Sequence, residues 1–225
     1  MVERIIIDPL KTNCYLYSIG KNKCIIIDPG GNETEIIGKI EMLNMIPVGM
    51  VFTHGHFDHT AAAGKLKEFY DKRGIEVKLA IHEKDKKYLG ASAKEANKRD
   101  FRAMGFDMAD FSFQIFNSLP EPDIILHEGD HPFDSDLRVI ETPGHTEGSI
   151  CLYSESKKLL FTGDTLFFEG IGRADLPGGD ETLLIKSIQE KLLNLPMETR
   201  VFPGHGPYTT IEREIQGNPF IHQPL

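Results

Sequence analysis

Four side chains that can bind a divalent metal lie close together in the segment 53–60. They are those of His54, His56, Asp58 and His59. The segment directly follows an apolar run, 48–52, which predicts a buried strand. Metals such as zinc bind imidazole nitrogens and carboxylate oxygens, and a catalytic site leaves one position open for water. A strand that delivers such side chains into a loop predicts a metal site.

The spacing within this segment predicts two half-sites. His54 and His56 are two residues apart, so on extended backbone they can project to the same side. Asp58 and His59 are adjacent and would diverge there, unless a helix begins beneath them. The Ala-rich sequence that follows predicts such a helix, from about Asp58 to Arg73.

Three further candidate ligands each follow an apolar strand and have glycine beside them. They are His145 after the run 137–140, Asp164 after 159–161 and His205 after 201–202. Each histidine alone would be read as a polar turn residue. Five histidines and two aspartates in one recurring setting instead predict a metal site on one rim of a sheet sandwich, where glycine lets the backbone pass close to the metals.

This ordered set of seven candidate ligands resembles that of the metallo-β-lactamase-fold hydrolases, over essentially the whole chain. The resemblance implies an α/β fold, a four-layer αββα sandwich, with residues 1–225 forming a single domain. It also implies two metal sites and a bridging ligand: His54, His56 and His145 for the first metal, Asp58, His59 and His205 for the second, and Asp164 between them.

Within that family, two segments resemble the short, single-domain glyoxalase II-like branch. They are 163–179 and the ending 218–221. The likeness implies hydrolysis of acyl thioesters, of the S-lactoylglutathione type, by a metal-bridging hydroxide. Asp58 would be the catalytic residue that orients this water or accepts its proton. Two divalent metal ions are expected, with zinc as the first choice and iron or manganese as alternatives.

Two residues outside the ligand set are candidates for supporting roles. Arg173 could bind a substrate carboxylate, because a guanidinium matches a carboxylate in a bidentate pair. A salt bridge to Asp175 is the alternative. Asp28 is the candidate for bracing the metal-bearing loops, as the resemblance implies. A turn-forming role before Pro29 is the alternative.

An oxidoreductase of the same fold, a persulfide dioxygenase with one iron, is the alternative function. It would use His54, His145 and Asp164 and would leave the other candidate ligands without a metal. The stretch 176–179 favours the hydrolase. A β-lactamase is less favoured because it is normally exported and we find no signal-peptide core.

The formal net charge of -9 and the pI near 5.5 argue against binding to nucleic acid or anionic membrane and against a nuclease. No apolar run approaches the ~20 residues needed to cross a bilayer. The expected partner is therefore a small-molecule substrate. The three cysteines are odd in number and lack metal-type spacing, so we expect reduced thiols and a cytoplasmic location.

The segment 83–117 interrupts the strand pattern and predicts a helical insertion. Its second half is rich in Phe and Met, which either pack on the body of the protein or form a lid beside the metal site. Asn32 and Asp180 are each expected to cap a helix. The remaining histidines are expected at the surface or in turns: His82, His127, His131 and His222.

Overall fold

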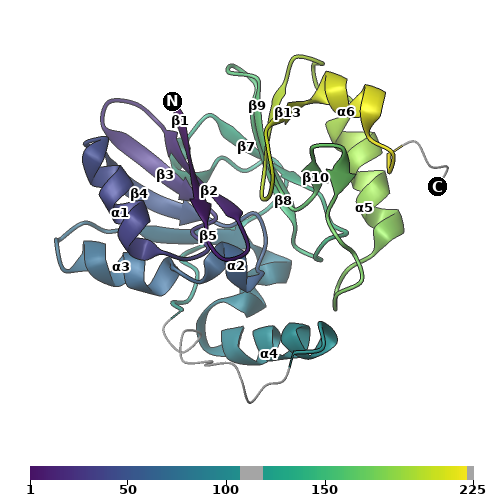
Figure 1. The fold of residues 1–225 in the computed structure, drawn as a ribbon. Helices are drawn as coiled ribbons and strands as arrows, with labels where there is room; N and C mark the ends of the chain where they lie inside the picture. Colours follow the sequence, from purple (N-terminus) through teal and green to yellow (C-terminus); the bar gives the residue numbers. More distant parts are fainter. Residues whose placement is uncertain (107–118, 222–225) are drawn as a thin grey trace.

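Two β-sheets face each other in the computed structural model, which describes residues 1–106 and 119–221 (Figure 1). Within these residues the first sheet runs in the order β1 to β6: β1 (Val2–Ile7), β2 (Thr12–Ser18), β3 (Lys23–Ile27), β4 (Ile46–Val51), β5 (Lys78–His82) and β6 (Ile124–Leu126). Strands β1 to β3 are antiparallel, and β3 to β6 are parallel.

The second sheet runs in the order β13, β12, β9, β8, β7. Its strands are β7 (Leu137–Glu141), β8 (Ile150–Ser154), β9 (Leu159–Gly163), β12 (Arg200–Pro203) and β13 (Thr209–Thr210). The short strands β10 (Leu166–Phe167) and β11 (Gly170–Ile171) pair with each other. A 3-10 turn, η4 (Pro132–Asp134), precedes β7.

The core between the sheets follows from the two-residue period of the strands. Ile25 and Ile27 of β3 point into this core, together with Val139 of β7 and Phe161 of β9. Ile26, between the first two, points to the opposite face of its sheet. Strands with apolar residues on both faces need a covering layer on each outer side.

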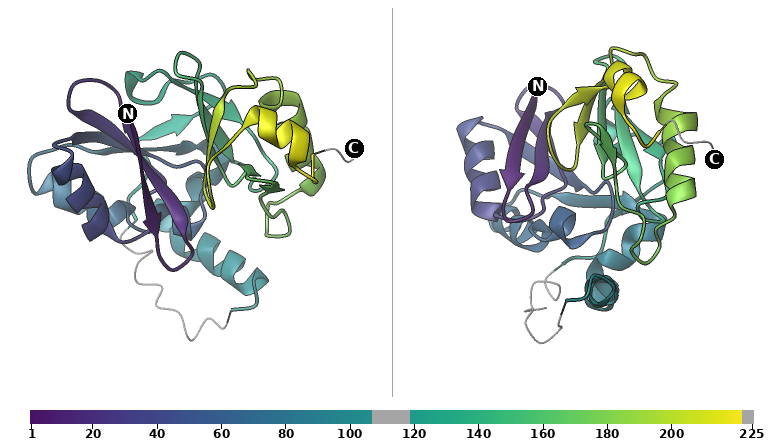
Figure 2. Two further views of the ribbon diagram at one scale, coloured as in Figure 1. Left: turned by 45° about the horizontal axis from the view of Figure 1, so that its top comes forward. Right: turned by 45° about the vertical axis from the view of Figure 1, so that its right-hand side comes forward.

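Helices supply those outer layers (Figures 1 and 2). The first sheet is covered by α1 (Glu33–Met42) and α3 (Ala63–Asp71), and the second by α5 (Glu181–Ser187), the π-helical turn η5 (Ile188–Leu192) and α6 (Ile211–Gly217). The buried stripe of Leu184, Ile188 and Leu192 packs on the second sheet as its spacing predicts. The αββα sandwich is therefore confirmed.

Both predicted helix caps are present. The Asn32 side chain accepts a hydrogen bond from the Glu35 N–H, and that of Asp180 accepts one from the Leu183 N–H at 2.9 Å. The three cysteines are free, as expected, and the structure shows that all three are buried. Among the described helices, none has the length and apolar character required to span a bilayer.

The single helix predicted over 58–73 is wrong, because the structure has α2 (Phe57–Thr60) and then α3. The Ala62 N–H donates to the Pro29 carbonyl at 3.0 Å instead of continuing the helical ladder. A Cβ on Gly30 would overlap the Asp58 carbonyl, so the loop after β3 packs directly against this turn. A contact distant in sequence thus divides the helix.

The insertion is helical over its described part, with 3-10 turns η1 (Glu83–Tyr88) and η2 (Gly90–Ser92) followed by α4 (Ala93–Ala103). Helix α4 lies beside the rim of the sandwich in both views of Figure 2. Phe101 is 3% exposed and belongs to the core on the first sheet, with its ring 5.0 Å from that of Phe57. The aromatic and Met residues at 108, 111, 113 and 116 lie outside the described residues.

The candidate ligands lie where strands end on one rim. Strands β7, β9 and β12 run parallel to one another within the second sheet, so their ends meet at the same edge. His145, Asp164 and His205 follow these three strands, and His54 follows β4 of the facing sheet. The arrangement on one rim, predicted from the glycine-flanked pattern, is confirmed.

Candidate metal centre

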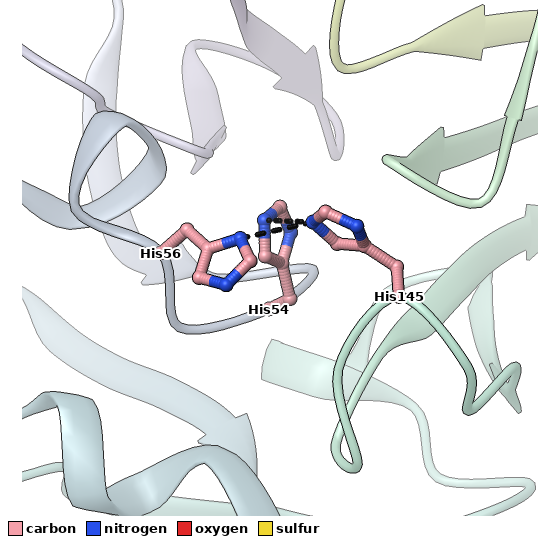
Figure 3. Close-up of side chains that lie close together, drawn as sticks. All are labelled: His54, His56 and His145. Carbon is pink, nitrogen blue, oxygen red and sulfur yellow. Dashed lines mark hydrogen bonds between the residues drawn. The ribbon is translucent and has the colours of Figure 1, made fainter. Parts of the chain in front are cut away.

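Three imidazole nitrogens converge in the first half-site (Figure 3). His145 Nε2 lies 3.2 Å from His54 Nε2 and 2.9 Å from His56 Nδ1. All three rings are buried. Nitrogens bound to one tetrahedral metal at normal lengths would be roughly 3.3 Å apart, so the geometry fits a shared ion.

The three histidines of this half-site are neutral at pH 7. Burial, followed by repulsion from neighbouring histidines, lowers the pKa of His54 well below its ordinary value. Burial also lowers the pKa of His56 to about 4 and the pKa of His145 to about 4. Neutral imidazole is the form that binds a metal, so this half-site is ready for an ion without losing protons.

The second half-site joins Asp58, His59 and His205. His205 Nε2 lies 3.3 Å from Asp58 Oδ2, and His59 Nε2 lies 3.5 Å from the same oxygen. The short helix α2 directs Asp58 and His59 toward the same site, because their backbone is helical there. One carboxylate and two imidazoles therefore face a common point.

Asp164 lies between the two half-sites. Its Oδ1 is 3.4 Å from His59 Nε2, whereas its Oδ2 is 3.6 Å from His205 Nε2 and 3.7 Å from His145 Nε2. One carboxylate therefore reaches ligands of both half-sites. The structure brings together all seven candidate ligands named from the sequence.

Buried atoms without hydrogen-bond partners show that the site fits bound ions. His59 Nε2 and Asp164 Oδ1 are buried and have no such partner within the described residues. Leaving polar atoms buried and unpaired is costly. The ligand atoms also group as metal sites require: one triad contains His54, His56 and His145, another Asp58, His59 and His205, and a third His54, His59 and Asp164.

The second half-site carries opposite charges when metal is absent. Burial alone would lower the pKa of His59, but three carboxylates, those of Asp58, Asp164 and Asp28, raise it to about 10. Against the same effect of burial, Asp58 and Asp164 raise the pKa of His205. Burial opposes ionisation of Asp58, but His59 and His205 hold its pKa well below the ordinary value. A metal entering this half-site must therefore displace protons.

Asp28 contacts His59 of the second half-site directly and reaches His54 of the first through Thr53. Its Oδ2 accepts the His59 Nδ1–H at 3.0 Å and the Thr53 hydroxyl at 2.7 Å, and its Oδ1 accepts the Thr53 N–H at 2.8 Å. Since the Thr53 hydroxyl proton goes to Asp28, its oxygen accepts the His54 Nδ1–H at 3.1 Å. Both rings are thus left with Nε2 free to face the site.

Close packing around the ligands requires glycine directly before His205. A Cβ on Gly204 would overlap Asp164 Oδ1 and lie 2.8 Å from His59 Cε1. The glycine before His205 therefore lets the backbone pass beside two candidate ligands.

Sequence reasoning missed two residues that brace the second half-site. The Thr12 hydroxyl donates to Asp58 Oδ2 at 2.9 Å. The Asn13 side-chain amide donates to the Pro203 carbonyl at 2.9 Å and the Gly206 carbonyl at 3.0 Å, on either side of His205. No spacing or composition sets these residues apart from other strand residues, because their partners lie far away in the sequence.

A pocket of about 220 Å³ opens onto the ligands. Its apolar wall is formed by Leu10, Phe57, Phe101, Met104 and Leu176, and Arg173 also lines it. The insertion therefore packs on the core and also walls the pocket. A larger groove of about 760 Å³ contains none of the candidate ligands, so the chemistry places the site in the smaller one.

Arg173 is held by the alternative partner considered from the sequence. Its Nε and one terminal nitrogen donate to the two oxygens of Asp175 at 2.7 and 2.8 Å. Its carbonyl accepts the His145 Nδ1–H at 2.7 Å. Arg173 thus orients a candidate ligand through its backbone, while its side chain stays at the pocket.

The expectation that His82 lies at the surface or in a turn is wrong. It ends β5, is 4% exposed, and its Nε2 lies 3.0 Å from Glu141. His127 is close enough to complete a possible metal triad. However, His82 Nδ1 accepts the Lys84 N–H, so Nε2 carries the proton and donates it to Glu141. This pair is satisfied without a metal. His127 and His131 are exposed, and His222 lies outside the described residues.

Comparison with known proteins identifies a family of metal-dependent hydrolases, in agreement with the site. A family model described as the metallo-beta-lactamase superfamily matches residues 7–205. The Haemophilus influenzae protein named hydroxyacylglutathione hydrolase GloC is 38% identical over 221 residues, which cover 98% of each chain.

Two solved structures are also similar. One, a di-iron-bound form of TTHA1623, is 33% identical, covers 97% of this chain and 99% of its own, and has a TM-score of 0.78. The other, BLEG-1 B3 metallo-beta-lactamase, is 32% identical, covers 99% of this chain and 100% of its own, and has a TM-score of 0.83. The chain therefore belongs to the metallo-β-lactamase superfamily and is a metal-dependent hydrolase of that family.

Proposed function

We propose that the protein hydrolyses acyl thioesters and that all seven candidate ligands hold two divalent metal ions, with zinc as the first choice. The observation that carries the proposal is the pair of half-sites that share Asp164 beneath a pocket with an apolar wall. Bound there, two such ions would lower the pKa of a water molecule and would polarise the carbonyl oxygen of the substrate.

Residues of the chain orient the attacking water and the candidate metal ligands. Asp58 is ionised and fixed by the Thr12 hydroxyl, so it can orient the attacking water and accept its proton. The network around Asp28 fixes His54 and His59, which keeps the ligands in one geometry before substrate arrives. Such preorganisation favours the transition state because little rearrangement is needed during reaction.

The pocket suits an acyl group joined to a polar thiol carrier. The acyl group of such a substrate would face the wall that contains Phe101, Met104 and Leu176. Arg173, at the same pocket, is positioned to bind a carboxylate of the carrier in place of Asp175. The likeness to GloC, named for hydroxyacylglutathione hydrolysis, supports the thioester class and S-lactoylglutathione as the reference substrate.

A comparison of substrates tests this proposal. S-lactoylglutathione and the N-acetylcysteamine thioester of lactate share the acyl group, but only the first carries the carboxylates of glutathione. We expect turnover of both, with a lower KM for the first. Turnover of neither, accompanied by hydrolysis of a chromogenic cephalosporin, would replace the proposal with β-lactam hydrolysis. Oxygen uptake on glutathione persulfide by an iron-loaded sample, without thioester turnover, would replace it with the dioxygenase.

A further inference from the structure

Asp85 is a buried carboxylate in the turn η1, at the start of the insertion. Its side chain is fully buried and accepts three hydrogen bonds. Oδ2 accepts the Gly55 N–H at 2.8 Å and the Thr146 hydroxyl at 2.7 Å, and Oδ1 accepts the Gly148 N–H at 3.0 Å. Charge-assisted bonds of this kind are among the stronger hydrogen bonds in proteins.

The three donors belong to the two loops that form the first half-site. Gly55 lies between His54 and His56, in the loop after β4 of the first sheet. Thr146 follows His145, in the loop after β7 of the second sheet. Asp85 therefore connects two sheets at the point where their histidines meet.

The two loops also make room for η1. A Cβ on Gly148 would lie 2.7 Å from the Asp85 carboxyl carbon and backbone nitrogen, and one on Gly55 would overlap the Tyr88 side chain. Larger residues at these glycines would push η1 away from both loops. Glycine in each loop and a carboxylate in the turn therefore form one packed unit.

One direct bond also joins the loops, from the Ile150 N–H to the Thr53 carbonyl at 2.8 Å. That bond lies before His54 and after the turn carrying His145. The Asp85 bonds instead attach to residues next to the ligands themselves. Their loss would act first on the separation of the histidine rings.

We propose that Asp85 is a positioning residue for the half-site of His54, His56 and His145. It fixes the two ligand loops at the separation that places His145 Nε2 within 2.9 Å of His56 Nδ1. The inference rests on the proposed binding of metal at this site. The insertion therefore does more than wall the pocket, because its first turn is tied to the ligands.

The test is metal affinity in backgrounds that retain one half-site. His205→Ala removes a ligand of the second half-site, and His56→Ala removes one of the first. Asp85→Asn keeps the shape of the side chain but replaces one oxygen by an amide group that cannot accept a hydrogen bond. Zinc affinity is measured by competition with a chromogenic chelator, and folding is checked by circular dichroism.

In the His205→Ala background, we expect Asp85→Asn to weaken zinc binding on the order of 10- to 100-fold, as the loss of an outer partner of metal ligands does. In the His56→Ala background, we expect the affinity to change by less than about threefold. Asp58 and His59 lie on α2 and His205 follows β12, so none of these ligands is next to a residue that Asp85 holds. Thr12→Val is the matched comparison, since it removes a donor to Asp58 and should show the opposite pattern.

Equal losses in both backgrounds, or no loss in the first, would overturn the assignment. If Asp85→Asn does not fold, the same measurement is made on Thr146→Val, which removes the Thr146 hydroxyl donor and leaves the Asp85 carboxylate in place. It should weaken zinc binding only in the His205→Ala background, and an unchanged affinity there would overturn the proposal. Wild-type protein that binds no metal would instead refute the proposed function itself.

Discussion

Asp28→Asn is the substitution that most directly tests how the ligands are held. Both Asp28 oxygens act as acceptors, for two donors from Thr53 and one from His59. An amide has one oxygen, so in either orientation its NH₂ group faces at least one of these donors. The neutral form of His59, which binds metal, can avoid the conflict only by changing tautomer, which would place a proton on the nitrogen that faces the metal site.

The magnitude follows from what is lost. Buried donors left without an acceptor cost about 1 to 3 kcal/mol, which lowers Tm by roughly 2 to 4 °C per kcal/mol in a chain of this size. Zinc affinity falls on the order of 10- to 100-fold when such an outer partner is removed. That loss corresponds to about 1.4 to 2.7 kcal/mol of binding free energy.

The assay is chelator competition for zinc, with thermal unfolding of the metal-free protein measured alongside. Asp136→Asn is the matched control. Asp136 accepts hydrogen bonds from Tyr17 and Ser154, and Tyr17 is at the end of β2 opposite to Thr12. We expect the control to lose stability but keep zinc affinity. If Asp28→Asn binds zinc like the wild type, this network does not orient the ligands.

Three further predictions concern protons, packing and the pocket. Because His59 holds its proton below a pKa of about 10 in the metal-free protein, metal binding at the second half-site releases it. The affinity there should therefore rise about tenfold per pH unit from roughly pH 6 to 9, whereas the first half-site should show no such slope. Calorimetry of the one-site backgrounds in buffers of different ionisation enthalpy counts the protons, and zero release at the second half-site would contradict this assignment. Gly204→Ala, whose Cβ would overlap Asp164, should weaken zinc binding about tenfold or more. The control is Gly206→Ala, whose Cβ would meet open space; it should keep its zinc affinity and lose only about 1 to 2 kcal/mol of stability, because alanine is strained at the positive φ of this position. Equal zinc affinities for these two variants would show that the close approach is unimportant. Asp175→Asn should release Arg173 and lower the KM for S-lactoylglutathione by about two- to fivefold, whereas Arg173→Lys should raise this KM. Both values come from steady-state kinetics. If neither variant changes the KM, Arg173 is not part of the substrate site.

The ligand set could be predicted because its signal is local. Each candidate ligand sits at the end of an apolar strand and beside glycine or another ligand, so strand period and turn chemistry already place them on one rim. The covering of both sheet faces is a finding of the structure, in which Ile25 and Ile27 point to one face and Ile26 to the other.

What escaped prediction depends on contacts between distant segments. The break between α2 and α3 comes from the Pro29 carbonyl, and His82 is buried because the second sheet supplies Glu141. Asp85 and Thr12 resemble ordinary turn and strand residues until their loops are placed together. Local patterns contain no information on such pairings.

The most direct test of the two-metal account is metal content per chain, measured together with thioester turnover. Wild-type protein and His59→Ala, both purified without added metal, are compared by elemental analysis and by hydrolysis of S-lactoylglutathione. The account predicts two metals and turnover for the wild type, and a folded His59→Ala protein that keeps at most one metal and has lost hydrolysis. Full activity of His59→Ala with a single bound metal would contradict it.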